Sequence, residues 1–171
     1  MKTKGTRENK LKEIDSKTLA NYILAKIGPM NQLKMQKLLY YVQAYHLAYF
    51  DKPIIEDDFE AWVHGPVSRK IWNEFKGVSL LYDDFYFENE ASGLEAITSV
   101  EATLSPEQVE LINDVLSEYG GLSSYKLECL THEETPWKTA RKGVPAGEPS
   151  DNLISKDLMQ HFYKELLYSK S

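Results

Sequence analysis

The chain has 171 residues, of which 42% are hydrophobic, and it contains a single cysteine. This length and composition predict one globular domain with its own core and exclude a disordered chain. One cysteine allows no internal disulfide, and the charged N-terminus has no apolar segment, so we expect a cytoplasmic protein. No apolar run approaches the about 18 residues that a membrane span needs, so no membrane partner is expected.

The net charge of −6 argues against general nucleic-acid binding, because phosphate contacts need clustered lysine and arginine. The charges are distributed unevenly. Residues 1–14 are rich in lysine and arginine, and we expect them to form a flexible basic arm. Residues 77–125 contain ten acids and no basic residue. This acidic segment is open to two interpretations, a solvated face that maintains solubility or a docking surface for a basic protein.

The first predicted helix begins after Asp15, a capping residue, and ends at Gly28. The next helix, Gln32 to Phe50, is apolar almost all round. Such a helix normally lies at the centre of a fold with neighbours on several sides. We therefore interpret its five aromatic side chains as core and not as a surface on which bases stack, which would need interleaved arginine and lysine.

A short strand is predicted at residues 57–64, where apolar and polar side chains alternate. Gly65 ends this strand, and Pro66 suits the first position of a following helix. Residues 77–103 mix aromatic, acidic and turn-forming residues. Here we expect an ordered loop or a hairpin, with residues 96–102 as a strand.

Clear helical signals return at Ser105, which forms a capping box with Gln108 ahead of an amphipathic helix. Further helices are predicted at 123–134, in a short turn after Pro136, and after Ser155.

The sum of these elements is a mainly α, compact helical domain. It contains about six helices around the central apolar helix at about 32–50, with a small strand or hairpin element near 57–64 and 80–103. We expect residues 15–171 to form this single domain.

Motifs for metal or cofactor chemistry are not found in the sequence. His132 and Glu133 match the first two residues of the zinc-protease motif H-E-x-x-H, but Pro136 occupies the position of the second histidine ligand. Glycine-rich phosphate loops and the nucleophile elbow are missing as well. We therefore predict no metal site and no cofactor.

One catalytic cluster is conceivable, from His64, Glu133, Glu134 and Arg141. Two carboxylates and a histidine can carry acid–base chemistry, as in a small hydrolase-type enzyme. The alternative is structural, with Arg141 paired to one of the glutamates and His64 capping the turn before Pro66. We favour the structural interpretation and expect no catalytic residues.

Three segments together resemble the motifs of one known family. They read KMQKLLYY at 34–41, EAWVHGPV at 60–67 and THEETPWKTAR at 131–141. They are similar to K-L-x-K-L-L-Y-[YF], E-A-W-x-x-G-P-V and T-H-x-E-x-P-W-x-x-[AT]-R, which occur in this order in the Panacea domain of SocA-like antitoxins. The resemblance extends over roughly residues 18–168, and Met35 replaces the more usual leucine.

The resemblance implies a mostly helical type II antitoxin of bacterial or phage origin. Such a protein neutralises a cognate protein toxin by direct protein–protein binding and is not an enzyme. Some family members deliver the toxin to a cellular protease, so a protease adaptor is the alternative. Others carry a separate DNA-binding domain, for which this chain has no room, so no direct DNA binding is expected.

The motif residues are suited to packing, capping and turns, and we interpret them as scaffold. They are Lys37, Leu38, Leu39, Tyr40, Glu60, Trp62, Gly65, Pro66, Val67, His132, Glu133, Pro136, Trp137 and Arg141. Partner choice is then expected outside the motifs, in residues 77–103, the basic arm and the acidic face. The candidate partner-binding residues are Asp83, Asp84, Phe85, Tyr86, Glu88 and Glu90.

Overall fold

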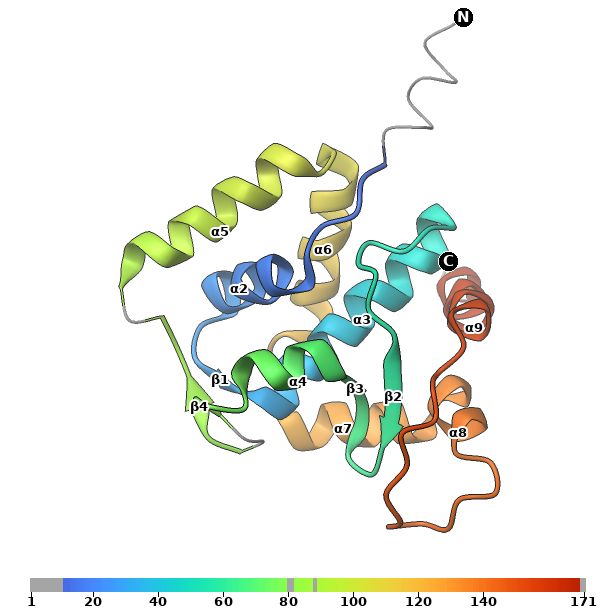
Figure 1. Cartoon of the computed structure of the whole chain (residues 1–171). Coiled ribbons are helices and arrows are strands. Elements are labelled where there is room, and N and C mark those ends of the chain that lie inside the picture. Colours follow the sequence, from blue (N-terminus) through green and yellow to red (C-terminus); the bar gives the residue numbers. More distant parts are fainter. Residues whose placement is uncertain (1–10, 80–81, 88, 170–171) are drawn as a thin grey trace, which may run out of the picture.

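The computed structural model describes residues 11–79, 82–87 and 89–169. Within these residues the fold is mainly helical, with eight helices and two small antiparallel sheets (Figure 1). The helices are α2 (Ser16–Ile27), α3 (Gln32–Phe50), α4 (Arg69–Phe75), α5 (Glu90–Thr103), α6 (Pro106–Tyr119), α7 (Ser124–Glu133), α8 (Thr135–Ala140) and α9 (Lys156–Ser169). The strands are β1 (Met30–Asn31), β2 (Phe59–Trp62), β3 (Gly65–Ser68) and β4 (Asp84–Phe85). The predicted mainly α class is confirmed.

The central helix is α3, which contacts α2, α6, α7 and α9 on its different sides (Figure 1). The side chain of Asn31 caps its first turn by accepting a hydrogen bond from the amide of Lys34 at 2.9 Å. Sixteen of its nineteen residues are buried. The apolar periphery of this helix is therefore core, as its sequence indicated.

Buried amide side chains of α3 fasten the loops that cross it. The Gln43 carboxamide accepts from the amide of Ile54 at 2.9 Å and donates to the carbonyl of Ile55 at 2.9 Å. The Gln36 carboxamide likewise accepts from the amide of Ser68 at 2.8 Å and donates to its carbonyl at 3.2 Å. These bonds satisfy polar groups that burial would otherwise penalise.

The strand or hairpin element predicted near 57–64 is confirmed as the β2–β3 hairpin, but its second strand occupies residues where a helix start was predicted. Pro66 lies opposite Ala61 in this hairpin and is not the first residue of a helix. The helix α4 begins at Arg69 instead, after Ser68, whose hydroxyl accepts from the amide of Ile71 at 3.2 Å. The physical reason is that Gln36 holds both main-chain groups of Ser68 in an extended segment.

The strand predicted at 96–102 is wrong, because residues 90–103 form α5. Of the 80–103 region, only β4 is a strand among the described residues, and it pairs with β1. The side chain of Asn89 caps α5, and Gly93, Ala96 and Val100 form its buried stripe against α2. A Cβ at Gly93 would lie 3.7 Å from Cβ of Ala25 on α2, which is an ordinary van der Waals distance.

Residues 1–10 of the expected basic arm lie outside the described residues. Its last residues pack on the domain. The carbonyl of Lys12 accepts from the side chain of Gln108 at 2.9 Å, and the amide of Ile14 donates to the carbonyl of Ile54 at 2.8 Å. Among the described helices, none combines the length and the hydrophobicity that crossing a membrane requires.

Candidate functional site

A cluster of buried tyrosines forms the centre of the molecule, where α3, α6 and α9 meet. Its members are Tyr40, Tyr41, Tyr45, Tyr119 and Tyr163. The rings of Tyr41 and Tyr119 stack with centroids 4.2 Å apart, and the hydroxyls of Tyr45 and Tyr119 are 2.7 Å apart. Tyr163 meets Tyr40 edge to face. The aromatic residues of the first motif are thus packed on one another and not open to a ligand.

Glu134, from the third motif, provides the acceptor for this cluster. Its Oε1 accepts from the hydroxyl of Tyr163 at 2.6 Å and from that of Tyr41 at 2.9 Å. Burial above all, and then the negative charge of Glu134, raise the pKa of Tyr41 far above its usual value. The hydroxyl therefore keeps its proton and donates.

The first and second motifs meet at Lys37, which is fully buried. Its Nζ donates to the carbonyl of Pro66 at 3.2 Å. Burial lowers the pKa of Lys37 to about 7, against the opposing effect of Glu128. Gly65 has a φ of 109°, and a Cβ at this position would lie 2.4 Å from Cε of Lys37. The stem of Lys37 therefore leaves no room for a side chain at position 65.

The third motif clamps β2 to the loop that follows α8. The guanidinium of Arg141 donates to the carbonyls of Ala61 at 2.9 Å and Glu148 at 2.6 Å. The indole of Trp137 donates to the carbonyl of Trp62 at 2.9 Å and lies beneath the guanidinium, 5.2 Å from ring centroid to Cζ. Arg141 thus satisfies main-chain carbonyls, a role for which its forked donors are suited.

Two further polar residues of the motifs, Glu60 and His132, also have contacts within the fold. The Glu60 carboxylate accepts from the indole of Trp62 at 2.8 Å and from Arg69 at 2.7 Å. Burial opposes its ionisation, but these hydrogen bonds prevail and lower the pKa of Glu60. The ring of His132 stacks on Trp137 at 4.0 Å, and burial lowers the pKa of His132.

The residues considered for catalysis are each engaged in a different place. His64 Nδ1 lies 3.0 Å from Glu128 Oε2, Glu134 receives tyrosine hydroxyls, and Arg141 holds main-chain carbonyls, whereas Glu133 is exposed. The expected cap by His64 is replaced by this contact with Glu128, which sequence reasoning missed. No local pattern relates His64 to Glu128, because the two residues lie 64 positions apart in the chain.

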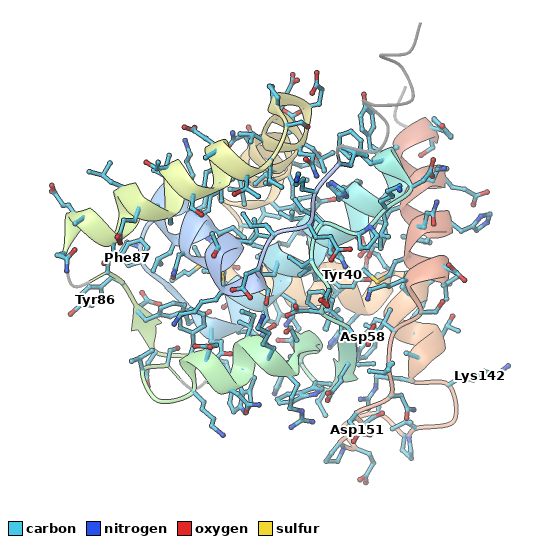
Figure 2. The ribbon with its side chains drawn as sticks, turned by 45° about the horizontal axis from the view of Figure 1, so that its top comes forward. Tyr40, Asp58, Tyr86, Phe87, Lys142 and Asp151 are labelled. Carbon is cyan, nitrogen blue, oxygen red and sulfur yellow. The ribbon has the colours of Figure 1, made fainter. Side chains whose placement is uncertain are left out.

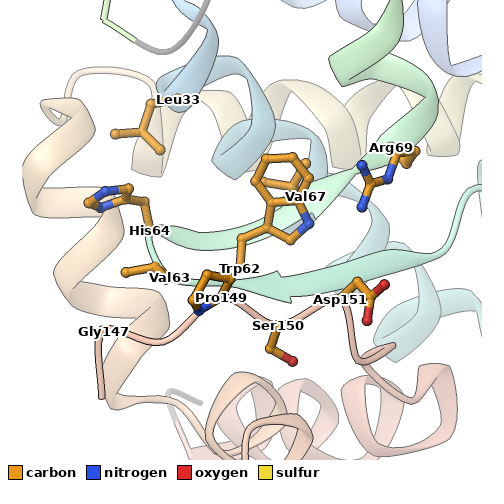
Figure 3. A pocket seen from close by; sticks show the side chains of 10 residues that line it. All are labelled: Leu33, Trp62, Val63, His64, Val67, Arg69, Gly147, Pro149, Ser150 and Asp151. Atoms are coloured by element: carbon orange, nitrogen blue, oxygen red, sulfur yellow. The ribbon is translucent and has the colours of Figure 1, made fainter. Parts of the chain in front are cut away.

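Among the described residues, no group of three or more histidine, cysteine, aspartate or glutamate side chains is placed to hold a metal ion. An open cleft of about 730 Å³ lies between the β2–β3 hairpin and the 147–151 loop (Figure 3). Its central side chain is Trp62, with Arg69 at 5.1 Å over the ring. Arg69 is already paired with Glu60, and the exposed carboxylate of Asp151 also lines the cleft.

A second hollow, the α2–α5 groove, has a volume of about 490 Å³ and contains candidate partner-binding residues. It is lined by Leu24, Ala25, Gly28, Pro29, Tyr86, Phe87, Asn89, Glu90, Gly93, Leu94 and Ile97. Tyr86 is 67% exposed and Leu94 is 64% exposed. Figure 2 shows Tyr86 and Phe87 beside the start of α5, far from Tyr40 in the interior.

Among the other candidates, Glu90 also lines this groove. Asp83, Asp84 and Glu90 are exposed, and Glu88 lies outside the described residues. Phe85 is only 6% exposed and packs on Phe75, with ring centroids 4.8 Å apart. Phe85 therefore anchors the segment to the core. Leu94 was not among the candidates, because only the helical register of α5 reveals that it points away from the buried stripe.

The fold and the site define a helical protein whose shared motifs form its internal frame. Residues 35–138, more than half of the chain, match the family described as "Antitoxin SocA-like, Panacea domain". The chain therefore belongs to the SocA-like antitoxin family.

A search of characterised proteins gives a relative of the same kind. The chain is 27% identical to "Antitoxin SocA" of Caulobacter vibrioides (strain NA1000 / CB15N) over 149 residues. The alignment covers 82% of this chain and 74% of that protein. No solved structure matches the chain significantly.

Proposed function

We propose that this protein is a cytoplasmic, non-enzymatic antitoxin that neutralises a cognate protein toxin by binding it directly. Family membership supports an antitoxin, and the relative that covers most of the chain carries that name. The internal hydrogen bonds of the motif residues support a mechanism of direct binding, not catalysis. Lys37, Glu134 and Arg141 are engaged within the protein, so its surface is what remains for a partner.

The observation that carries the proposal is the α2–α5 groove. Large apolar side chains seldom remain exposed together without a function, and tyrosine is favoured at protein interfaces. Tyr86 and Leu94 are both exposed in this groove, and Glu90 lies beside them. We propose that this surface, together with the exposed Asp83 and Asp84, contacts the toxin.

The experiment is co-expression with the neighbouring gene. We expect that gene to arrest growth when expressed alone, that co-expression of this protein restores growth, and that the two products co-purify. Persistent arrest with both proteins present would refute the proposal. The level of the toxin in the same cells distinguishes stoichiometric neutralisation, with an unchanged level, from the protease-adaptor alternative, with a falling level.

A further inference from the structure

A second concave surface lies between α3, α6 and α9, and the family motifs do not explain it. We call it the acidic groove, and its volume is about 280 Å³. Its floor is apolar and formed by Tyr45, Val115 and Tyr119, all of which are nearly buried. The hydroxyls of the two tyrosines bind each other at 2.7 Å, so the floor is fixed by the core beneath it.

One wall of the acidic groove is a row of carboxylates along α6. Glu107, Glu110, Asp114 and Glu118 line it and are exposed. Their spacing of three, four and four residues places them along one side of the helix. Within the described part of the chain, no basic side chain lies within 4.0 Å of the carboxylates of Glu107, Glu110 or Asp114.

The opposite wall is apolar and exposed. Tyr49, on α3, is 65% exposed, and Leu167, on α9, also lines the groove. A face that only maintained solubility would not need an apolar floor and an exposed aromatic side chain beside its charges. The lining combines one sign of charge with buried and exposed apolar surface, as grooves that bind helices do.

We propose that the acidic groove binds a basic amphipathic helix of the toxin, an inference that rests on the proposed function. The row from Glu107 to Glu118 extends about 16 Å at 1.5 Å per residue, which is three turns of a helix. A partner helix of that length places apolar side chains on the floor and lysine or arginine toward α6. The small volume admits the anchoring side chains, so the helix lies along the groove and not within it.

The charges of the groove give the contact its specificity. Glu107, Glu110 and Asp114, which form no ion pair with any described residue, attract a basic helix before contact. Salt reduces this attraction, because exposed charges are screened within about 8 Å at physiological ionic strength.

A designed peptide tests the groove without knowledge of the toxin. The probe is a fluorescein-labelled helical peptide of leucine and lysine, with leucines at helical spacing, measured by anisotropy against the full-length protein. We expect binding that weakens at high salt, and no binding of the matched leucine–glutamate peptide. Equal binding of both peptides would overturn the proposal.

The location is tested with charge reversal. The variant Glu110→Lys/Asp114→Lys is expected to weaken binding of the lysine peptide about tenfold, since attraction becomes repulsion at two positions. The control Glu95→Lys/Glu148→Lys makes the same change of net charge at exposed positions outside the groove and is expected to change affinity less than twofold. Equal losses in both variants would show a general charge effect and overturn the assignment.

The contribution of the apolar wall is tested separately. Tyr49→Ser removes an exposed side chain, so folding is expected to be unaffected by circular dichroism, while binding weakens several-fold. An unchanged affinity for the peptide would overturn the proposed binding position of the helix. A full-length variant with Lys2, Lys4, Arg7 and Lys10 changed to Gln examines the basic arm as a rival occupant. A gain of tenfold or more in peptide affinity would identify the arm as the occupant and overturn the proposal.

The product of the neighbouring gene provides the final comparison. If it binds the wild type and Glu110→Lys/Asp114→Lys weakens the complex as it weakens the peptide, the groove is a toxin-binding site. If the complex forms but the variant leaves it unchanged, the groove inference fails while the proposed function stands. If no complex forms with the wild type, the proposed function itself fails.

Discussion

The carboxylate of Glu134 accepts a hydrogen bond at 2.9 Å from the hydroxyl of Tyr41, a residue 93 positions away in the chain. The same oxygen accepts from Tyr163 at 2.6 Å. One acidic side chain therefore connects α3 to α9 and to the start of α8. Two motifs that are far apart in the sequence are in this way parts of one internal frame.

Removal of this acceptor is expected to destabilise the fold. Glu134→Ala leaves the hydroxyls of Tyr41 and Tyr163 without their carboxylate, and each such charged hydrogen bond contributes about 1.5–3 kcal/mol. We expect a loss of about 3 kcal/mol in the free energy of unfolding, measured by urea denaturation. The matched control is Glu133→Ala, an exposed neighbour, which should change stability by less than about 0.5 kcal/mol. Equal effects would contradict the bridging role of Glu134.

The central position of α3 makes a second prediction. Leu39 is fully buried, and truncation of a buried leucine to alanine costs about 2–5 kcal/mol. We expect Leu39→Ala to lower the melting temperature clearly, whereas Leu153→Ala, at a residue that is 58% exposed, should melt like the wild type. A wild-type melting curve for Leu39→Ala would show that α3 is not the core helix.

The glycine of the second motif is expected to tolerate no side chain. Gly65→Ala combines a φ of 109° with a Cβ that meets the stem of Lys37, so we expect a loss of about 1–3 kcal/mol in stability. Gly121→Ala is the control, since nothing lies within 4 Å of its Cβ and its φ is outside the left-handed region. Differential scanning calorimetry of both variants tests this, and a neutral Gly65→Ala would contradict it.

Lys37 makes stability depend on pH in a definite direction. Burial lowers its folded-state pKa to about 7, below the about 10.4 of an unfolded lysine. Between these values the unfolded chain binds more protons, so the contribution of Lys37 to stability rises with pH. Below pH 7 both states are protonated and the penalty of the buried charge is complete.

The measurement compares the wild type with Lys37→Met by urea denaturation at pH 6, 7.5 and 9. The free energy of unfolding of the wild type is expected to rise relative to that of Lys37→Met from pH 7.5 to pH 9, and to change little below pH 7. The comparison cancels the other titrating groups that both proteins share. A difference that does not vary with pH would show that Lys37 keeps its ordinary pKa.

The toxin-facing role of the α2–α5 groove leads to a binding prediction. Tyr86→Ala removes a largely exposed aromatic side chain, and interface tyrosines of this kind often contribute about 2 kcal/mol or more to affinity. We expect at least tenfold weaker binding of the neighbouring gene's product by calorimetry, without loss of stability. Tyr125→Ala, at a residue that is 74% exposed on α7, is the matched control and should bind like the wild type. A larger loss of affinity for Tyr125→Ala than for Tyr86→Ala would show that the interface lies outside the α2–α5 groove.

The helical class and most helices were predictable because they depend on local signals. The capping box of Ser105 and Gln108 forms as expected, with the Ser105 hydroxyl accepting at 3.2 Å. The apolar periphery of α3 likewise indicated burial on all sides. That the motif residues serve as scaffold stays a prediction, and the individual partners that the structure gives them were not accessible from the sequence.

The errors occurred where tertiary contacts override local preference. Ile97, Thr98 and Val100 favour a strand, yet α5 is helical because Gly93, Ala96 and Val100 pack on α2. Pro66 suits a helix start, yet it lies in β3.

Helical periodicity, caps, the segregation of acidic from basic residues and the motifs of the SocA-like family could be identified before folding is considered, since each is a property of neighbouring residues. The contacts between residues that are far apart in the chain became known only from the folded structure. Glu134 binds Tyr41 and Tyr163, Arg141 holds main-chain carbonyls, and the carboxylates of α6 lie beside an apolar floor supplied by α3. Burial and the distances between remote side chains exist only once the chain has folded, and no local pattern encodes them.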